Sequence, residues 1–183
     1  MHHDGPSTPA LEEVAASGLE HRVVVTRPAH SAEESAELQG IPPEALLRTI
    51  VVRRGADDYL FVLVPAGRRL DWPRLRAHLG VNRLSLPDAD EARQATGYER
   101  GTITPFGASR AWPVIADASV LEQPMVAIGG GARGVNLHLE PRKLVEGLGA
   151  EVVDVTTPPL GRRSTSVAAR IRAIRTRSKP AGT

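Results

Sequence analysis

The sequence predicts an α+β fold with a mixed, largely antiparallel sheet. Helix-like and strand-like segments are interleaved along the chain, and neighbouring strands joined by short turns outnumber β-α-β units. The chain has 183 residues, which suits one domain, and no internal repeat is present. Since 41% of the residues are hydrophobic but only 3% aromatic, we expect a core of Leu, Val, Ile and Ala.

The first helix is expected from Pro9 to Ser17. Thr8 precedes it as an N-cap, proline occupies the first helical position, and Gly18 follows as a stop. The segment HRVVVT that comes next is rich in β-branched residues and is typical of a strand.

A second helix and a hairpin are expected after this strand. Ser31 and Glu34 have the spacing of a capping box, and Gly40 and a pair of prolines mark the end of the helix. The runs RTIVVRR and DYLFVLVP are separated by the turn-forming residues 55–58, so they predict a β-hairpin.

Two short helices with acidic caps should follow the hairpin. Asp71 caps one that runs to Leu79, and Asp88 with Glu91 caps another that runs to Thr96; a glycine follows each. In the second half, WPVIAD, PMVAI, VNLHLE and EVVDV are expected as strands, and PRKLVEGL as a helix with proline at its first position.

Charge divides the chain into two parts. Seven of the 23 basic residues and none of the 21 acidic residues lie from Thr156 onward, so residues 1–155 carry 16 basic against 21 acidic residues. We therefore expect a domain over 1–155 and a basic, flexible tail over 156–183. Such a tail suits a polyanionic partner, because cations near phosphates release counterions; a solvated terminus without a partner is the alternative.

Several classes of protein and site are excluded at this stage. The chain has no cysteine, so it has no disulfide, thiol nucleophile or thiolate metal site. The six histidines show no metal-ligand spacing, and we expect no metal and no cofactor. The chain has neither a signal peptide nor an apolar run of about eighteen residues, which predicts a cytoplasmic protein without a membrane partner.

The glycine-rich string at 129–134 satisfies the G-x-G-x-x-G pattern of dinucleotide sites. That pattern requires a following helix, whereas VNLHLE alternates with period two and predicts a strand, so a nucleotide-dependent oxidoreductase is rejected. The string is instead expected as a hairpin turn that permits close approach of a ligand, with Arg133 as a fixed cation. In the strand, Asn136 and His138 share the face turned away from the core.

Residues 97–107, with three glycines and a proline, form the most unusual segment. A loop of this composition can direct backbone amides at a ligand oxygen, although a connector packed through Ile103 and Phe106 is the simpler interpretation of the segment by itself. The loop resembles the G-Y-x-x-G-x-x-x-P-x-G signature of the YbaK/ProRS-associated editing domains. Four further segments resemble this family in order and spacing, and the resemblance covers about residues 20–155.

The resemblance implies an α+β domain built around a barrel-like sheet, acting without a metal on the 3′ end of aminoacyl-tRNA. It implies a trans-editing deacylase that removes wrongly attached amino acids, with an aminoacyl-tRNA synthetase as a further partner. In this family the G-x-x-x-P loop holds the aminoacyl ester, and a lysine of a K-T strand stabilises the reacting group. The implied catalytic residues are Arg48, Gly101 and Pro105, and the implied substrate-binding residues are Thr49, Thr102, Ile103, Thr104, Gly129, Gly130, Arg133, Asn136 and His138.

The sequence departs from the family at three of these positions. Arg48 stands where the family has its lysine, and Gly129 and Asn136 stand where relatives commonly carry a serine and an acid. An arginine keeps the positive charge but cannot act as a general base. The alternative function is therefore a tRNA-binding module of the same fold with weakened catalysis. For either function, Tyr98 or Phe106 are candidates for stacking on the terminal adenine of the tRNA.

Overall fold

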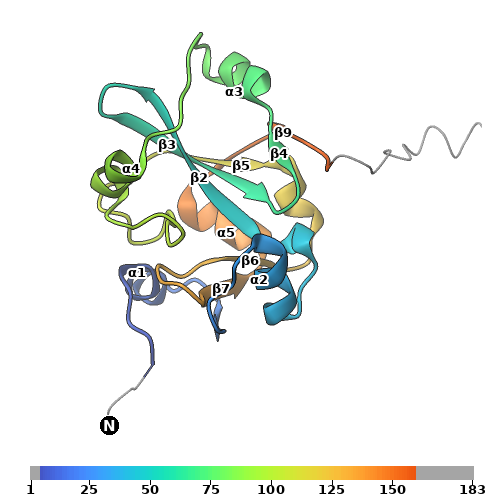
Figure 1. The fold of residues 1–183 in the computed structure, drawn as a ribbon. Coiled ribbons are helices and arrows are strands. Elements are labelled where there is room, and N and C mark those ends of the chain that lie inside the picture. Colours follow the sequence, from blue (N-terminus) through green and yellow to red (C-terminus); the bar gives the residue numbers. More distant parts are fainter. Residues whose placement is uncertain (1–4, 160–183) are drawn as a thin grey trace, which may run out of the picture.

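The computed structural model describes residues 5–159, in which the strands form three sheets (Figure 1). A four-stranded sheet has the order β2-β3-β5-β8, a three-stranded sheet the order β1-β7-β6, and β4 pairs with β9. The strands are β1 (Arg22–Val25), β2 (Leu47–Gly55), β3 (Asp58–Pro65), β4 (Arg69–Leu70), β5 (Val114–Asp117), β6 (Val126–Gly129), β7 (Val135–Leu139), β8 (Glu151–Val153) and β9 (Thr156–Thr157).

All five predicted helices are present, and their caps explain where they begin. The side chains of Thr8, Ser31, Asp71 and Asp88 each accept a hydrogen bond from the backbone amide three residues further on. The helices are α1 (Pro9–Ser17), α2 (Ala32–Gln39), α3 (Trp72–Leu79), α4 (Ala89–Thr96) and α5 (Pro141–Leu148), with 3₁₀ turns η1 (Pro43–Ala45) and η2 (Ala118–Glu122). Within residues 5–159, no helix is long and apolar enough to cross a membrane.

The expected α+β class and mixed pairing are confirmed. The hairpin β2–β3 is antiparallel, as are β1–β7 and β6–β7, whereas β3–β5 and β5–β8 are parallel. The sheet is not the barrel that the family resemblance implied. Among the described residues, the four-stranded and three-stranded sheets meet at a single bridge, between Leu46 and Ala127, and do not close.

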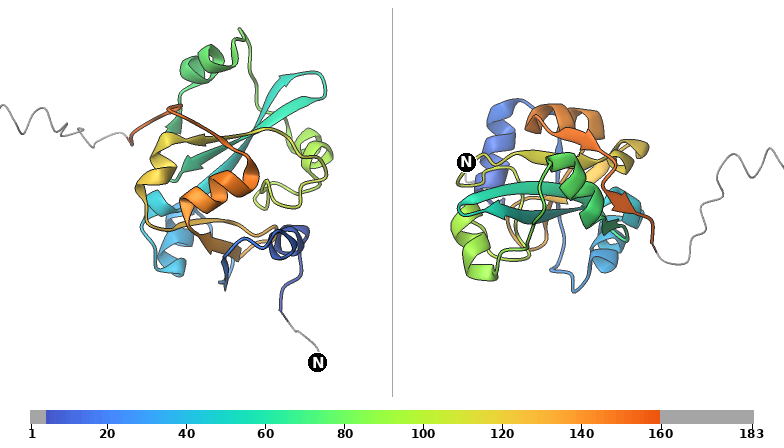
Figure 2. Two further views of the ribbon diagram at one scale, coloured as in Figure 1. Left: turned by 180° about the vertical axis from the view of Figure 1, so that it is seen from behind. Right: turned by 90° about the horizontal axis from the view of Figure 1, so that it is seen from above.

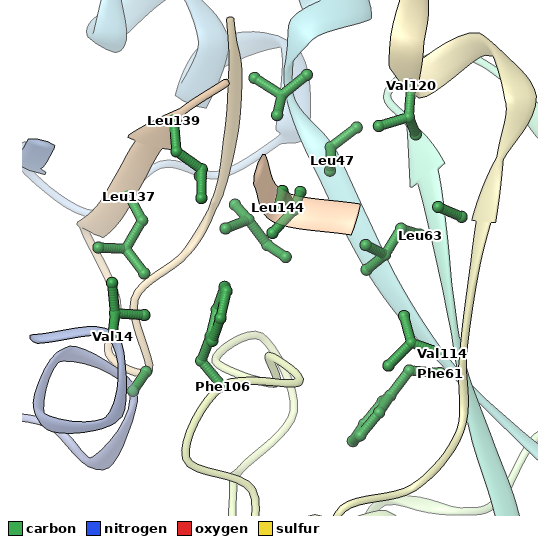
Figure 3. Packing of buried hydrophobic residues seen from close by; sticks show 14 of the residues in the cluster. Val14, Leu47, Phe61, Leu63, Phe106, Val114, Val120, Leu137, Leu139 and Leu144 are labelled. Carbon is green, nitrogen blue, oxygen red and sulfur yellow. The ribbon is translucent and has the colours of Figure 1, made fainter. Parts of the chain in front are cut away.

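The largest core cluster lies between the two main sheets (Figure 3). Leu47, Phe61 and Leu63 project from the four-stranded sheet, Leu137 from β7, and Leu144 from α5. A second cluster covers the opposite face of the β2–β3 hairpin and includes side chains of β3, α3 and β5. Because successive residues of a strand point to opposite faces, the hairpin supplies both clusters and is the centre of the fold.

The C-terminal part of the described chain packs back onto the fold. Thr156 is buried, pairs with Leu70 of β4, and accepts a hydrogen bond from the Nε atom of Arg68 at 2.6 Å. Figure 2 shows this short strand at the C-terminal end of the described chain. The basic tail expected over 156–183 lies, from residue 160 on, outside the described residues.

Candidate functional site

A cleft of about 530 Å³ lies where the two main sheets diverge beyond the Leu46–Ala127 bridge. Its walls come from segments far apart in the sequence, including the first half of β2, the loop after α4, and the turn between β6 and β7. The segment before α2 and the first turn of that helix complete it. The polar or charged side chains among its lining residues are His30, Ser31, Ser35, Arg48, Thr49, Arg100, Thr102, Arg133 and Asn136.

The cleft has cationic side chains and no acidic one. Arg48, Arg100 and Arg133 line it, together with His30, whereas none of the lining residues is Asp or Glu. Within residues 5–159, these three arginines form no ion pair with an aspartate or glutamate. An acid-free cleft with unpaired guanidinium groups favours an anionic ligand.

The loop over residues 97–107 is held against the turn between β6 and β7. Gly101 has φ +90°, and the guanidinium nitrogens of Arg133 lie 3.2–3.3 Å from the position that a Cβ atom on Gly101 would occupy. Arg133 also donates a hydrogen bond to the carbonyl oxygen of Arg100 at 3.4 Å. The positive φ favours glycine at this position, and a side chain there would displace the guanidinium of Arg133 by a few tenths of an ångström.

Helix α1 and its N-cap residue make hydrogen bonds to both the loop over residues 97–107 and the turn between β6 and β7. The hydroxyl of Thr8 donates to the carbonyl oxygen of Gly130 at 2.5 Å, and the amide of Gly107 donates to the carboxylate of Glu13. Figures 1 and 2 show α1 beside the end of the loop and the tip of the β6–β7 hairpin. The position of the site loops therefore depends on a helix that is far from them in sequence.

Strand β2 brings Arg48 and Thr49 to the cleft in different ways. Arg48 is exposed, and its guanidinium donates one hydrogen bond to the carbonyl oxygen of Arg68 at 2.7 Å. An arginine has five N–H donors, so this contact leaves most of them available to a ligand. The hydroxyl of Thr49 is buried and has no hydrogen-bond partner in the described part of the chain.

Strand β7 places Asn136 and His138 at two different clefts. Asn136 is buried but lines the main cleft, and its side chain makes no hydrogen bond within residues 5–159. His138, expected on the same face, is only 4% exposed, because α2 covers it, and it lines a second cleft of about 300 Å³. Burial and the nearby guanidinium of Arg22 hold the pKa of His138 below its usual range.

The structure brings eight of the twelve implied site residues together and separates four. Thr104 is fully buried, and its hydroxyl has no hydrogen-bond partner among residues 5–159. Pro105 and Gly130 are also buried and are not among the lining residues of the cleft. The eight that line the main cleft are Arg48, Thr49, Gly101, Thr102, Ile103, Gly129, Arg133 and Asn136.

The stacking role considered for Tyr98 and Phe106 is wrong. Both side chains are buried in the main core cluster, and the hydroxyl of Tyr98 donates to the carbonyl oxygen of Phe106 at 2.7 Å. Burial, with a smaller contribution from the carboxylate of Glu13, raises the pKa of Tyr98 to about 12. These rings shape the loop from inside and are not accessible to a nucleobase.

Three parts of the cleft were not expected from the sequence. They are the residues around the start of α2, the pair Leu86–Pro87 before α4, and Arg100. The capping signal at Ser31 located the helix but gave no indication of what its first turn would face. As for metals, no group of three or more His, Asp or Glu side chains within residues 5–159 could hold an ion.

The sequence of the chain is similar to those of several known proteins. Residues 26–146 match the model of the aminoacyl-tRNA editing domain family. The chain is 23% identical over 127 residues to the "Putative Cys-tRNA(Pro)/Cys-tRNA(Cys) deacylase EbsC" of Enterococcus faecalis, covering 69% of this chain and 77% of that protein. It is 28% identical over 107 residues to the proline–tRNA ligase of Thermosipho africanus, of which it spans 19%, while the match covers 58% of this chain.

Solved structures show the same fold. A crystal structure of "a putative trans-editing enzyme for prolyl tRNA synthetase" has a TM-score of 0.76 at 25% identity, covering 84% of this chain and 99% of that one. The crystal structure of "hypothetical protein APE2540" has a TM-score of 0.75 at 28% identity, covering 82% of this chain and all of the other. The region that matches the family model, residues 26–146, begins after α1 and ends before the C-terminal strands β8 and β9.

Proposed function

Because the chain belongs to the aminoacyl-tRNA editing domain family, we propose that it is a trans-editing deacylase that hydrolyses amino acids wrongly attached to tRNA. The substrate is the aminoacylated 3′ end of the tRNA, and an aminoacyl-tRNA synthetase is a further partner. The observation that carries this proposal is the acid-free cleft, in which three unpaired arginines lie beside the G-x-x-x-P loop. A phosphate-bearing ligand complements such a cleft, whereas a cationic one does not.

The reaction proposed is the hydrolysis of the aminoacyl ester by a water molecule. The water oxygen attacks the ester carbonyl, the carbon–oxygen bond to the ribose breaks, and the released ribose oxygen takes a proton. Arg48 and the backbone amides of Gly101 and Ile103, which line the cleft, would stabilise the oxyanion that forms in between. Arg48 cannot remove the proton from the water, because a guanidinium keeps its proton in proteins, so the base is the solvent or the substrate itself.

The alternative is a module that binds the aminoacyl end but turns it over slowly or not at all. The observation that favours it is the hydrogen bond from Arg48 to the carbonyl oxygen of Arg68, which directs part of the guanidinium away from a ligand. Asn136 supports it as well, since an amide in place of an acid can accept a hydrogen bond from a water molecule but cannot take up its proton as a general base.

Charge reversal in the cleft tests the binding step that both functions share. Arg133→Glu should weaken binding of aminoacylated tRNA at least tenfold, because it replaces an attractive charge by a repulsive one beside the phosphates. Arg142→Glu is the matched control, since Arg142 is an exposed arginine of α5 outside the cleft. Equal affinities of the two variants, measured by fluorescence anisotropy, would locate the tRNA elsewhere.

We also propose that hydrolysis needs no metal ion. The lining residues of the cleft include one histidine and no carboxylate, which is a poor donor set for a hydrolytic metal. Activity should therefore be unchanged after treatment with EDTA and dialysis. Loss of hydrolysis that one divalent ion restores would contradict a metal-free mechanism.

The basic C-terminal tail is proposed as an additional contact to the tRNA backbone. Pro159, the last described residue, lies near Gly67. Gly67 directly precedes Arg68, whose carbonyl oxygen accepts the hydrogen bond from Arg48 of the cleft. Deleting residues 160–183 should leave the melting temperature unchanged, weaken tRNA binding, and reduce the slope of log affinity against log salt. An identical salt slope for both proteins would exclude the tail from binding.

A further inference from the structure

A chain of three hydrogen bonds links the second cleft to the wall of the main cleft. Arg22 of β1 donates to the Nδ1 atom of His138 at 3.3 Å, and the Nε2 atom of His138 lies 2.8 Å from the side-chain oxygen of Gln39. The side-chain nitrogen of Gln39 then donates to the hydroxyl oxygen of Ser35, one turn earlier on α2, at 3.0 Å. Ser35 lines the main cleft, whereas His138 does not.

The direction of this chain follows from its first member. An arginine can only donate, so Nδ1 of a neutral His138 must accept and the ring proton must sit on Nε2. Gln39 then presents its oxygen to the ring, which leaves its NH₂ group to donate to Ser35. The hydroxyl of Ser35 is held as an acceptor by Gln39, and its own proton remains free.

The surroundings of His138 keep the ring neutral at neutral pH. Burial lowers its pKa, and the adjacent charge of Arg22 lowers it further. The other charged or titratable residues around this second cleft are Glu20, His21, Glu140 and Lys143, and the ammonium of Lys143 lies 2.6 Å from a carboxylate oxygen of Glu20.

This chain of hydrogen bonds adds a polar contact to the small apolar contact that holds helix α2. Ala36 is the one buried residue of this eight-residue helix, and it packs in a small cluster with Leu46, Ala66 and Ala127. The bond between Gln39 and His138 connects the last turn of α2 to β7, which also carries Asn136, a lining residue of the main cleft.

We infer that Ser35 is a substrate-binding residue that donates a hydrogen bond to an acceptor oxygen of the bound aminoacyl-tRNA end, with Gln39 and His138 as positioning residues. The inference rests on the proposed function, because it assigns the contact to that ligand. Ser35 makes no hydrogen bond through its hydroxyl proton within residues 5–159, and it lines the cleft in which a ligand would supply an acceptor. The acceptor is an oxygen of the aminoacyl group or of the terminal nucleotide.

The variant Gln39→Glu separates this role from a purely structural one. A glutamate has nearly the same shape and accepts from His138 through a charge-assisted bond, so the anchoring of α2 is kept or strengthened. A carboxylate has no proton to donate, however, and Ser35 must then donate its own proton to Glu at position 39. The hydroxyl can no longer donate to the ligand, so binding should weaken although the fold does not.

The experiment measures the affinity of the full chain for two probes by fluorescence anisotropy. One probe is a tRNA acceptor-stem hairpin with an amide-linked, non-hydrolysable 3′ amino acid, and the other is the same hairpin uncharged. Ser35→Ala and Gln39→Glu should each weaken binding about 3- to 10-fold, the usual range for one hydrogen bond. Ser35→Thr keeps a hydroxyl at this position and should bind with an affinity close to that of wild type. Ser17→Ala, in the last turn of α1, is the control and should not change the affinity.

Each outcome decides between defined alternatives. A loss confined to the charged probe assigns the acceptor to the aminoacyl group, and an equal loss for both probes assigns it to the nucleotide. If wild type binds the probes but Ser35→Ala or Gln39→Glu binds equally well, with unchanged melting temperatures, the inference is overturned. If wild type binds neither probe, the proposed function itself fails.

Discussion

Arg48→Ala should reduce deacylation about 10²–10³-fold while leaving the melting temperature nearly unchanged. One preorganised donor directed at an oxyanion is typically worth that factor in rate. Its loss should cost little in folding, because Arg48 is exposed and its one hydrogen bond is to the carbonyl oxygen of Arg68, which solvent can replace. The measurement is the single-turnover rate of amino-acid release from mischarged tRNA, with a thermal melt of each variant.

Arg48→Lys provides the control for charge at this position. A lysine keeps the cation that the family resemblance implies here, so this variant should keep or raise activity. If wild type binds aminoacyl-tRNA without hydrolysing it and Arg48→Lys gains turnover, the result favours the binding module. Unfolding of Arg48→Ala would show that the residue is structural, and an unchanged rate would remove it from the mechanism.

Gly107→Ala should destabilise the protein by about 3 kcal/mol or more. Gly107 has φ +66°, which costs an alanine about 1 kcal/mol or more, and an added Cβ atom would overlap the carbonyl group of Pro9. That group belongs to the first turn of α1, a backbone that can move only with the helix. Relief of the overlap must lift the loop over residues 97–107 from α1, so activity should fall together with stability.

Gly97→Ala is the matched control for this substitution. Gly97 has a similar φ of +78°, but the nearest atom to its added Cβ is the Cβ of Ser109 at 3.4 Å, an ordinary contact. The control should therefore lose only the conformational part, about 1 kcal/mol. Equal free energies of unfolding for both variants, measured by urea titration, would show that the contact between Gly107 and α1 does not hold the loop.

The helices could be predicted from the sequence because their signals are local. Thr8, Ser31, Asp71 and Asp88 each lie next to the helix that they cap, and the hydrogen bonds they make span three residues. The pairing of the strands could not be predicted in the same way. The parallel pairs β3–β5 and β5–β8 and the short pair β4–β9 join residues far apart in sequence, and nothing local specifies their partners.

The site was predictable where a strand or a motif determined it. Alternation along β7 correctly separated Leu137 from Asn136, but it could not show that α2 covers His138 and leaves Asn136 in the cleft. The binding role inferred for Ser35 depends on a contact between α2 and β7. This contact joins Gln39 and His138, which are 99 residues apart in the sequence. Such tertiary contacts are absent from any local pattern.

The activity proposed for this cleft is the hydrolysis of aminoacyl-tRNA. The most direct measurement is the release of amino acid from a panel of mischarged and correctly charged tRNAs by the purified protein, compared with Arg48→Ala and with spontaneous hydrolysis. Wild type should accelerate hydrolysis of at least one mischarged tRNA and leave the correctly charged tRNA intact, and Arg48→Ala should lose the acceleration. Rates equal to spontaneous hydrolysis across the whole panel, with tRNA bound in the cleft, would contradict the proposed activity.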